Sequence, residues 1–136
     1  MGRVVVHFDG ASVSTGGQYH GGWGYTIEGE GMEHEGCGRV AASGQATNNV
    51  AEYTAILEAL EFLRSRGYQG PVRILGDSQL VVRQFSGEYK VRAPHLKPHH
   101  QKLLELASSF SHVEMEWVPR ELNQRADALS KRGLTG

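Results

Sequence analysis

Four carboxylic acids stand at the beginnings or ends of the regular elements that the sequence predicts. Asp9 ends a first β-branched run and Asp77 ends a second one. Glu52 lies in the first turn of the strongest helix and Asp127 in the last helix. A β-α-β crossover brings the first strand end, the helix start and the next parallel strand end to one edge of a sheet. If this crossover forms, three of the acids are expected to meet at one rim.

Clustered carboxylates repel one another and raise one another's pKa unless hard cations neutralise them. Mg²⁺ takes oxygen ligands and keeps bound water and substrate phosphates. Two such ions about 4 Å apart clamp an in-line phosphoryl displacement. The chemistry predicted for the acids, once they meet, is therefore metal-dependent cleavage of phosphodiesters.

Each acid also has an ordinary structural explanation. Asp9 and the glycine after it form a turn signal, and Asp77 is suited to cap the next helix. Glu52 stands three residues after Asn49 and so resembles the second half of a capping box. Asp127 fits an exposed helical position. Taken singly, these explanations are the stronger ones, and only the joint pattern favours a metal site.

A helix over residues 49–66 is expected to position Glu52. Its apolar side chains recur at the i, i+3, i+4 spacing of a buried helix face, and they are Val50, Tyr53, Ile56, Leu57, Leu60 and Leu63. At about 100° per residue, Glu52 lies about 90° from the middle of this stripe. The carboxylate is therefore expected at the border between core and solvent, where it can point sideways along the sheet on which the helix packs.

The remaining elements alternate in type along the chain. Strands are predicted over 3–9, 22–28, 33–42, 72–77 and 112–118, and further helices over 78–85, 94–110 and 122–132. The polar segment 11–21 predicts a loop, and Gly36 and Gly38 predict bulges or close backbone approaches. The order β-β-β-α-β-α-α-β-α predicts an α/β fold: an antiparallel meander of three strands, extended by two more into one mixed sheet and flanked by about four helices.

Composition limits the class of protein. The 136 residues are expected to form a single domain, 1–136, that buries a core without disulfides or structural metal. No apolar stretch approaches the roughly 20 residues that span a bilayer. Cys37 is the only cysteine, which excludes an internal disulfide and favours a reducing cytoplasm. The net charge of −1 gives no sign of a nucleic-acid binder over the whole domain.

The motifs around the acids together resemble type 1 ribonuclease H. They are Phe-Asp-Gly-Ala-Ser at 8–12, Thr-Asn-Asn-Val-Ala-Glu-Tyr at 47–53, Gly-Asp-Ser-Gln-Leu-Val at 76–81 and Ala-Asp-Ala-Leu at 126–129. The resemblance spans nearly the whole chain in order, with compatible spacing between elements. The stretches 87–92 and 118–123 are most similar to the compact archaeal and bacterial branch of the family.

This resemblance implies the ribonuclease H-like fold and endonucleolytic cleavage of the RNA strand of RNA/DNA hybrids, leaving 5′-phosphate and 3′-hydroxyl ends. The implied cofactor is a pair of Mg²⁺ ions, with Mn²⁺ as an alternative. Asp9 would bridge both ions, and Asp127 would complete the ion that activates the attacking water. Glu52 and Asp77 would hold the ion at the leaving 3′-oxygen.

The resemblance also implies contacts to the hybrid. Asn48, Asn49 and Gln79 match family positions that read 2′-hydroxyls and base edges in the minor groove, and Thr47 matches one that holds a DNA phosphate. An amide can donate and accept at a ribose hydroxyl, which is the group that distinguishes RNA from DNA. These amides argue against a DNA-cleaving or strand-transferring relative of the same fold.

The sequence departs from the family pattern in two places. Many members carry a histidine in the loop before the last helix, and residues 118–127 contain none. Larger members insert a basic handle between the second and third helices, where this chain has a short link. Lys90, Arg92 and Lys97 are expected to hold the DNA backbone instead, with Tyr89 as a stacking group.

Other readings stay open beside the nuclease. The alternative function is a catalytically weak or silent module that binds hybrids or double-stranded RNA, although no acid is damaged. A zinc site at His95 and His99 has the right i, i+4 spacing but lacks a third ligand nearby. Trp23 and Trp117 are expected in the core. A monomer without membrane contact is the expected state.

Overall fold

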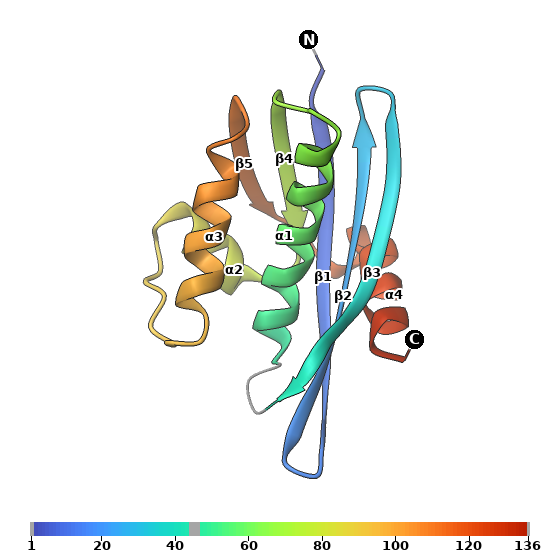
Figure 1. The fold of residues 1–136 in the computed structure, drawn as a ribbon, viewed down its shortest axis with the longest axis vertical. Helices are drawn as coiled ribbons and strands as arrows, with labels where there is room; N and C mark the ends of the chain where they lie inside the picture. Colours follow the sequence, from blue (N-terminus) through green and yellow to red (C-terminus); the bar gives the residue numbers. More distant parts are fainter. Residues whose placement is uncertain (1, 44–46, 136) are drawn as a thin grey trace.

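The computed structural model describes residues 2–43 and 47–135, with residues 41–43 described by their backbone only. Figure 1 shows the chain as one sheet with helices on both faces. In chain order the elements are β1 (Val4–Thr15), β2 (Gln18–Gly29), β3 (Met32–Ser43), α1 (Asn48–Ser65), β4 (Pro71–Gly76), α2 (Gln79–Ser86), α3 (Lys97–Ala107), β5 (His112–Trp117), the 3-10 turn η1 (Arg120–Leu122) and α4 (Gln124–Thr135).

The sheet has the order β3-β2-β1-β4-β5. β2 pairs antiparallel with β1 and β3, while β4 pairs parallel with β1 and β5. The predicted α/β fold, with an antiparallel meander extended by two strands into a mixed sheet, is confirmed. None of the described helices is both long and apolar enough to cross a membrane.

Helices α1 and α4 pack on opposite faces of the sheet. A Cβ on Gly10 of β1 would meet the backbone of α1, whereas one on Gly24 of β2 would meet the backbone of α4. Gly10 pairs with Trp23, the neighbour of Gly24, and consecutive strand residues point to opposite faces. Asp9, the candidate acid on β1, therefore stands between two helices, with α1 on one side of the sheet and α4 on the other.

The core lies between α1, α3 and the adjoining sheet face. The predicted stripe of α1 is confirmed, because each of its members is buried. The largest fully buried side chains include Tyr53, Ile56, Leu60 and Leu63 of α1, Phe8 and Val6 of β1, Ile74 of β4 and Leu103 of α3. Burial of about ten such groups holds α1 on the strands that carry two of the acids.

The predicted loop over 11–21 is wrong. β1 and β2 continue as a long hairpin, paired from Ala11 opposite Gly22 to Thr15 opposite Gln18. Its two-residue turn is Gly16-Gly17, with φ of 59° and 81°, a conformation that glycine adopts without strain. Residues 13–19 are exposed. With solvent on both faces, the hairpin end needs no apolar alternation, so the pattern that marks a strand is missing there.

Two alternatives were predicted for Gly36 and Gly38, a bulge or a close approach, and the structure has the second. The pairing of β3 with β2 continues without a bulge at these glycines, and the irregularity falls between Tyr19 and Gly21. The expected close approach is confirmed, because the rings of Tyr25 and Trp23 cover these two glycines.

Boundaries and exposure account for the other differences. Trp117 is 46% exposed because β5 is an edge strand, whereas Trp23 packs against the core. α1 has Thr47 at its N-cap without a capping side-chain bond, so the capping box that offered an ordinary explanation for Glu52, with Asn49, does not form. α3 starts only at Lys97, with proline in its first turn.

Candidate active site

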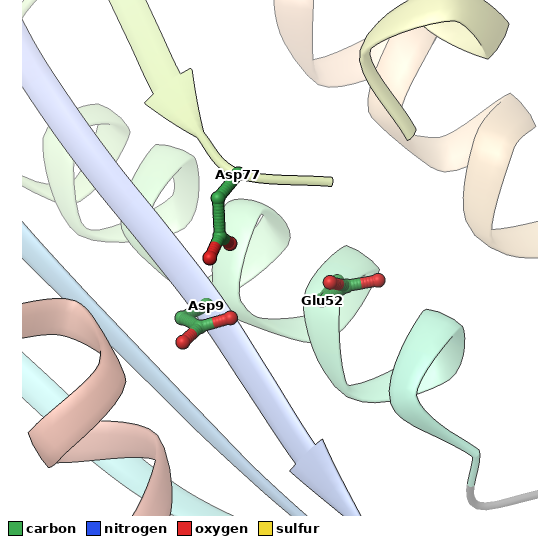
Figure 2. Close-up of side chains that lie close together, drawn as sticks. All are labelled: Asp9, Glu52 and Asp77. Carbon is green, nitrogen blue, oxygen red and sulfur yellow. The ribbon is translucent and has the colours of Figure 1, made fainter. Parts of the chain in front are cut away.

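Three acids meet where β1, α1 and β4 converge. Figure 2 shows Asp9 on β1, Glu52 on α1 and Asp77 just beyond β4, with their carboxylates turned toward a common space. Each offers an oxygen, and these oxygens all lie within 4.8 Å of one another. We call Asp9, Glu52 and Asp77 the acid triad. The sequence predicted that these three would meet, and the structure brings them together.

The parallel pairing of β1 with β4 sets the distance between two members of the triad. The last pair in register is His7 with Leu75, and Asp9 and Asp77 each stand two residues beyond it. A Cβ on Gly76 would lie 2.4 Å or less from atoms of the Phe8 ring, so glycine lets that ring pack beneath the two acids. β1 runs on to Thr15, so Asp9 lies inside this strand and not at its predicted end. It stands beside the end of β4, where Asp77 follows Gly76.

A glycine in β1 also allows Asp9 and Glu52 to lie close together. A Cβ on Gly10 would lie 2.5 Å from the Glu52 backbone nitrogen, closer than real Cβ contacts come. The missing side chain lets the first turn of α1 lie directly against β1. Asp9, the neighbour of Gly10, is thereby brought beside Glu52.

Burial and mutual repulsion raise the pKa of two triad members. The pKa of Asp9 is raised to about 7 by burial and then by Asp77 and Asp127, against a 2.9 Å bond from the Gly10 amide that lowers it. The pKa of Glu52 is raised to about 8 by burial and then by Asp9 and Asp77, while the Ser78 hydroxyl opposes the shift. Near neutral pH these carboxyls retain protons that a bound cation would displace.

The fourth predicted acid, Asp127, lies in the first turn of α4. It stands close enough to Asp9 to raise the pKa of that carboxyl. Its own carboxylate forms a 3.1 Å ion pair with Lys131 one turn later. Asp127 does not belong to the group whose oxygens lie within 4.8 Å of one another. The structure therefore places it beside the triad rather than in it.

The predicted minor-groove residues border the triad along the chain. Asn48 and Asn49 open α1 one turn before Glu52, and Gln79 opens α2 two residues after Asp77. Asn48 and Gln79 are exposed and Asn49 is half-buried. The hydroxyl oxygen of Thr47 is buried without a hydrogen-bond partner among the described residues.

The predicted backbone contacts lie further away. Tyr89, Lys90 and Arg92 are exposed in the segment between α2 and α3, which Figure 1 shows on the outer side of these helices, away from β1. The ring of Tyr89 lies 5.5 Å from the Arg83 guanidinium carbon. The structure does not bring these side chains to the triad.

Sequence reasoning missed the residues that support Asp77. Asn123, which precedes α4, donates from Nδ2 to the Phe8 carbonyl at 2.9 Å and lies 3.5 Å from Asp77 Oδ1. The indole of Trp117 donates to the Asp77 carbonyl at 3.2 Å, and the Arg120 guanidinium stands 3.8 Å from Asp77 Oδ2. An asparagine before a helix looks like an ordinary cap, so no local signal distinguished it.

The donor set fits a hard divalent cation. Three carboxylate oxygens in one small space are the ligands that Mg²⁺ and Mn²⁺ prefer, and no thiolate or imidazole belongs to the group. Among the described residues Arg120 approaches only Asp77, so Asp9 and Glu52, whose pKa values are raised, lack a positive partner there. A divalent ion would supply that charge.

Comparison with known proteins places this arrangement in a family. A family profile described as "Reverse transcriptase-like" matches residues 7–133. The chain is 38% identical over 133 residues to Ribonuclease HI of Halobacterium salinarum, covering 98% of this chain and 65% of that protein. It is 36% identical to a Ribonuclease H of Phenylobacterium zucineum, covering 98% of this chain and 91% of the relative.

Solved structures agree. RNase H1 of Halobacterium salinarum superposes with a TM-score of 0.85 at 36% identity, covering 98% of both chains. LC11-RNase H1, solved in complex with an RNA/DNA hybrid, superposes with a TM-score of 0.84 at 33% identity, covering 97% of this chain and 96% of that one. Fold and acids thus define a member of the reverse transcriptase-like class. Within that class, the chain belongs to the type 1 ribonuclease H family.

Proposed function

We propose that this protein hydrolyses the RNA strand of RNA/DNA hybrids at internal positions, leaving 5′-phosphate and 3′-hydroxyl ends. The observation that carries the proposal is the acid triad, whose three oxygens lie within 4.8 Å of one another. Support comes from ribonuclease H relatives and from a similar protein solved with a hybrid. The chain spans 65% of the Halobacterium relative, so the proposal concerns the activity of this domain.

The metal ligands we propose are Asp9, Glu52, Asp77 and Asp127. Two Mg²⁺ ions bound there, or Mn²⁺ in their place, would activate the attacking water and stabilise the leaving oxygen. The protein's part is to hold Asp9 and Glu52 buried and close together, so that their charge is available to cations. Asp127 contributes from α4, beside Asp9.

Substrate selection is assigned to the amides that flank the triad. Asn48, Asn49 and Gln79 stand at the starts of α1 and α2, where their side chains can donate to and accept from a ribose 2′-hydroxyl. Thr47 would hold a phosphate of the DNA strand. In this division the amides recognise the ribose and the triad holds the cations for hydrolysis of the RNA strand.

Weaker contacts to the DNA backbone are assigned to the segment between α2 and α3. Tyr89, Lys90 and Arg92 are exposed there and carry one ring and two positive charges. Because such contacts neutralise phosphates, their contribution should fall as salt rises. We further propose that residues 1–136 act as a single domain, as a monomer and in the cytoplasm.

The test is cleavage of a duplex whose RNA strand is end-labelled, in Mg²⁺, beside matched all-DNA and all-RNA duplexes. Internal cutting of the RNA in the hybrid alone is expected. Chelator and Asp9→Asn should both abolish it, because each removes the cations from the triad. Cutting of the all-RNA duplex as well would show relaxed selectivity. Binding of the hybrid without any cutting would contradict the nuclease and leave the alternative of a silent binding module.

A further inference from the structure

Asn123 is a deeply buried polar side chain beside the triad. It lies between η1 and α4 and is 1% exposed. None of the metal or substrate roles proposed above involves it. Its position is nevertheless fixed by contacts with two of the strands that carry the acids.

The Asn123 amide lies between the backbone carbonyl of Phe8 and the carboxylate of Asp77. Its Nδ2 carries two hydrogens. One is donated to the carbonyl of Phe8, the residue before Asp9, over 2.9 Å, and the other faces Asp77 Oδ1 at 3.5 Å. The first contact has the length of a good hydrogen bond and anchors the amide on β1. The second contact, between Asn123 Nδ2 and Asp77 Oδ1, is long for a hydrogen bond, but it places a buried donor in front of the Asp77 carboxylate.

The other contacts of Asp77 cannot replace this one. Trp117 holds the Asp77 backbone carbonyl at 3.2 Å, which leaves the side chain free to rotate. Arg120 approaches the second carboxylate oxygen at 3.8 Å, but its side chain is 82% exposed and its charge is screened by solvent. Asn123 is thus the buried hydrogen-bond donor that faces an oxygen of the Asp77 carboxylate among the described residues.

Stability alone does not explain an amide at this place. The Oδ1 of Asn123 is buried and has no hydrogen-bond partner among the described residues. Burying an unpaired amide oxygen is unfavourable, so the hydrogen bonds that favour an asparagine here are those donated by Nδ2. The contacts made by Nδ2 are those with Phe8 and Asp77, and both lead to the triad.

We propose that Asn123 is a positioning residue that turns the Asp77 carboxylate toward Asp9 and thereby fixes the spacing of the metal ligands. The inference rests on the proposed function, because it assumes that the triad holds cations. Groups that orient metal ligands typically change metal affinity or activity by about 10- to 100-fold when removed. Groove contacts to the hybrid do not involve Asn123, so substrate binding should be spared.

The experiment measures Mg²⁺ binding to the free protein by calorimetry and, separately, kcat and KM on a hybrid. In Asn123→Ala, the Kd for Mg²⁺ should rise about tenfold or more and kcat should fall about tenfold or more. KM for the hybrid should stay within about twofold, since the substrate contacts are intact. The Mg²⁺ titration supplies a readout that does not depend on turnover.

Two controls separate positioning from loss of stability. Gln124→Ala changes the exposed neighbour and should leave Kd, kcat and melting temperature unchanged. Leu103→Ala opens a cavity in α3, away from the triad, and should lower the melting temperature while Kd and kcat, measured well below it, stay at parent values. If Asn123→Ala lowers only the melting temperature, as Leu103→Ala does, the proposal is overturned.

Two further outcomes are distinguishable. If Asn123→Ala does not fold, Asn123→Ser keeps one donor hydrogen in a smaller side chain, and a Mg²⁺ Kd equal to that of the parent would overturn the proposal. If the parent binds Mg²⁺ but cuts no hybrid, the nuclease proposal fails while the Kd comparison still decides the role of Asn123. A parent that binds no Mg²⁺ would overturn both.

Discussion

The same chemical group stands in opposite surroundings at two places in this molecule. In the acid triad, burial and like charges raise the pKa of Glu52 to about 8. On the sheet face away from α1, Glu116 accepts from Arg73 at 3.1 and 2.7 Å, and this pairing lowers its pKa. We call Arg3, Arg73, Glu114 and Glu116 the ion-pair ladder of β4 and β5.

The ion-pair ladder and the acid triad differ in how the charge of their carboxylates is neutralised. In the ladder every carboxylate has an arginine within 4.0 Å and lies in solvent, where such pairs add little to stability and are easily replaced. The cation that the described residues place beside the triad is the largely exposed Arg120, which stands 3.8 Å from Asp77, whereas the buried Asp9 and Glu52 form no salt bridge among those residues. Folding therefore works against the ionisation of these two acids. A chain keeps such an arrangement where a ligand supplies the missing charge.

The largest difference is expected for the conservative loss of one carboxylate at each place. Glu52→Gln should lower hybrid cleavage about 1000-fold or more, because a metal ligand is lost. It should also stabilise the metal-free protein at pH 8 by about 2 kcal/mol, since a buried charge is removed. Glu116→Gln should leave cleavage within about twofold. The measurements are initial cleavage rates and urea unfolding in chelator, and a Glu52→Gln protein that is both active and less stable would reverse the comparison.

The next largest effect is the pH dependence of the metal-free fold. The pKa values of Asp9 and Glu52, about 7 and about 8, lie above their ordinary values of 3.8 and 4.5. Between about pH 4 and pH 8 the folded protein therefore binds more protons than the unfolded one. Stability should consequently fall as pH rises through this window, by about 2–4 kcal/mol.

Saturating Mg²⁺ should flatten this slope by stabilising the folded protein most at high pH, where both carboxyls are ionised. The measurement is urea unfolding between pH 4 and pH 9, in chelator and in Mg²⁺. Glu52→Gln provides the matched control, because it should remove the larger part of the slope. If the stability of the metal-free protein rose from pH 5 to pH 8, ionisation of the triad would not be the destabilising process.

The fold and the meeting of the triad could be predicted because their signals are local or topological. The apolar stripe of α1 marks its buried face, and the crossover from β3 through α1 to β4, which pairs parallel with β1, brings Asp9, Glu52 and Asp77 together. The position of Asp127 beside Asp9 followed from a resemblance, and the catalytic roles of all four acids remain predictions.

What the sequence could not show depends on contacts between distant residues. Asn123 donates a hydrogen bond to the carbonyl of Phe8, more than a hundred positions earlier, and the residues next to Asn123 in the sequence do not predict this contact. The exposure of Trp117 depends on β5 being an edge strand, which strand order alone decides. The end of the first hairpin lacks apolar alternation because no core lies against it, so its strands read as a loop.

The approach of β1 to α1 supplies a third test of the triad. Gly10→Ala would place a methyl group 2.5 Å from the Glu52 backbone nitrogen, so strand and helix must separate. The expected results are a loss of about 2–3 kcal/mol in the free energy of unfolding and a weaker Kd for Mg²⁺. Gly17→Ala is the control, since a methyl there meets nothing within 4 Å and only strains a φ of 81°. Equal Mg²⁺ affinity in both variants would show that this close approach does not set the ligand spacing.

The smallest effect is expected in the ion-pair ladder. Arg73→Met and Glu116→Gln should each lower the melting temperature by no more than about 3 °C, because the partners are exposed and water replaces the lost contact. About 0.5 M NaCl should lower the parent's melting temperature toward theirs, since salt screens charges in solvent. Neither variant should change the Kd for Mg²⁺, because neither side chain belongs to the group of oxygens that lie within 4.8 Å of one another. A tenfold weaker Kd for Mg²⁺ in Glu116→Gln would contradict this expectation. It would show that the ion-pair ladder and the acid triad are coupled through β4.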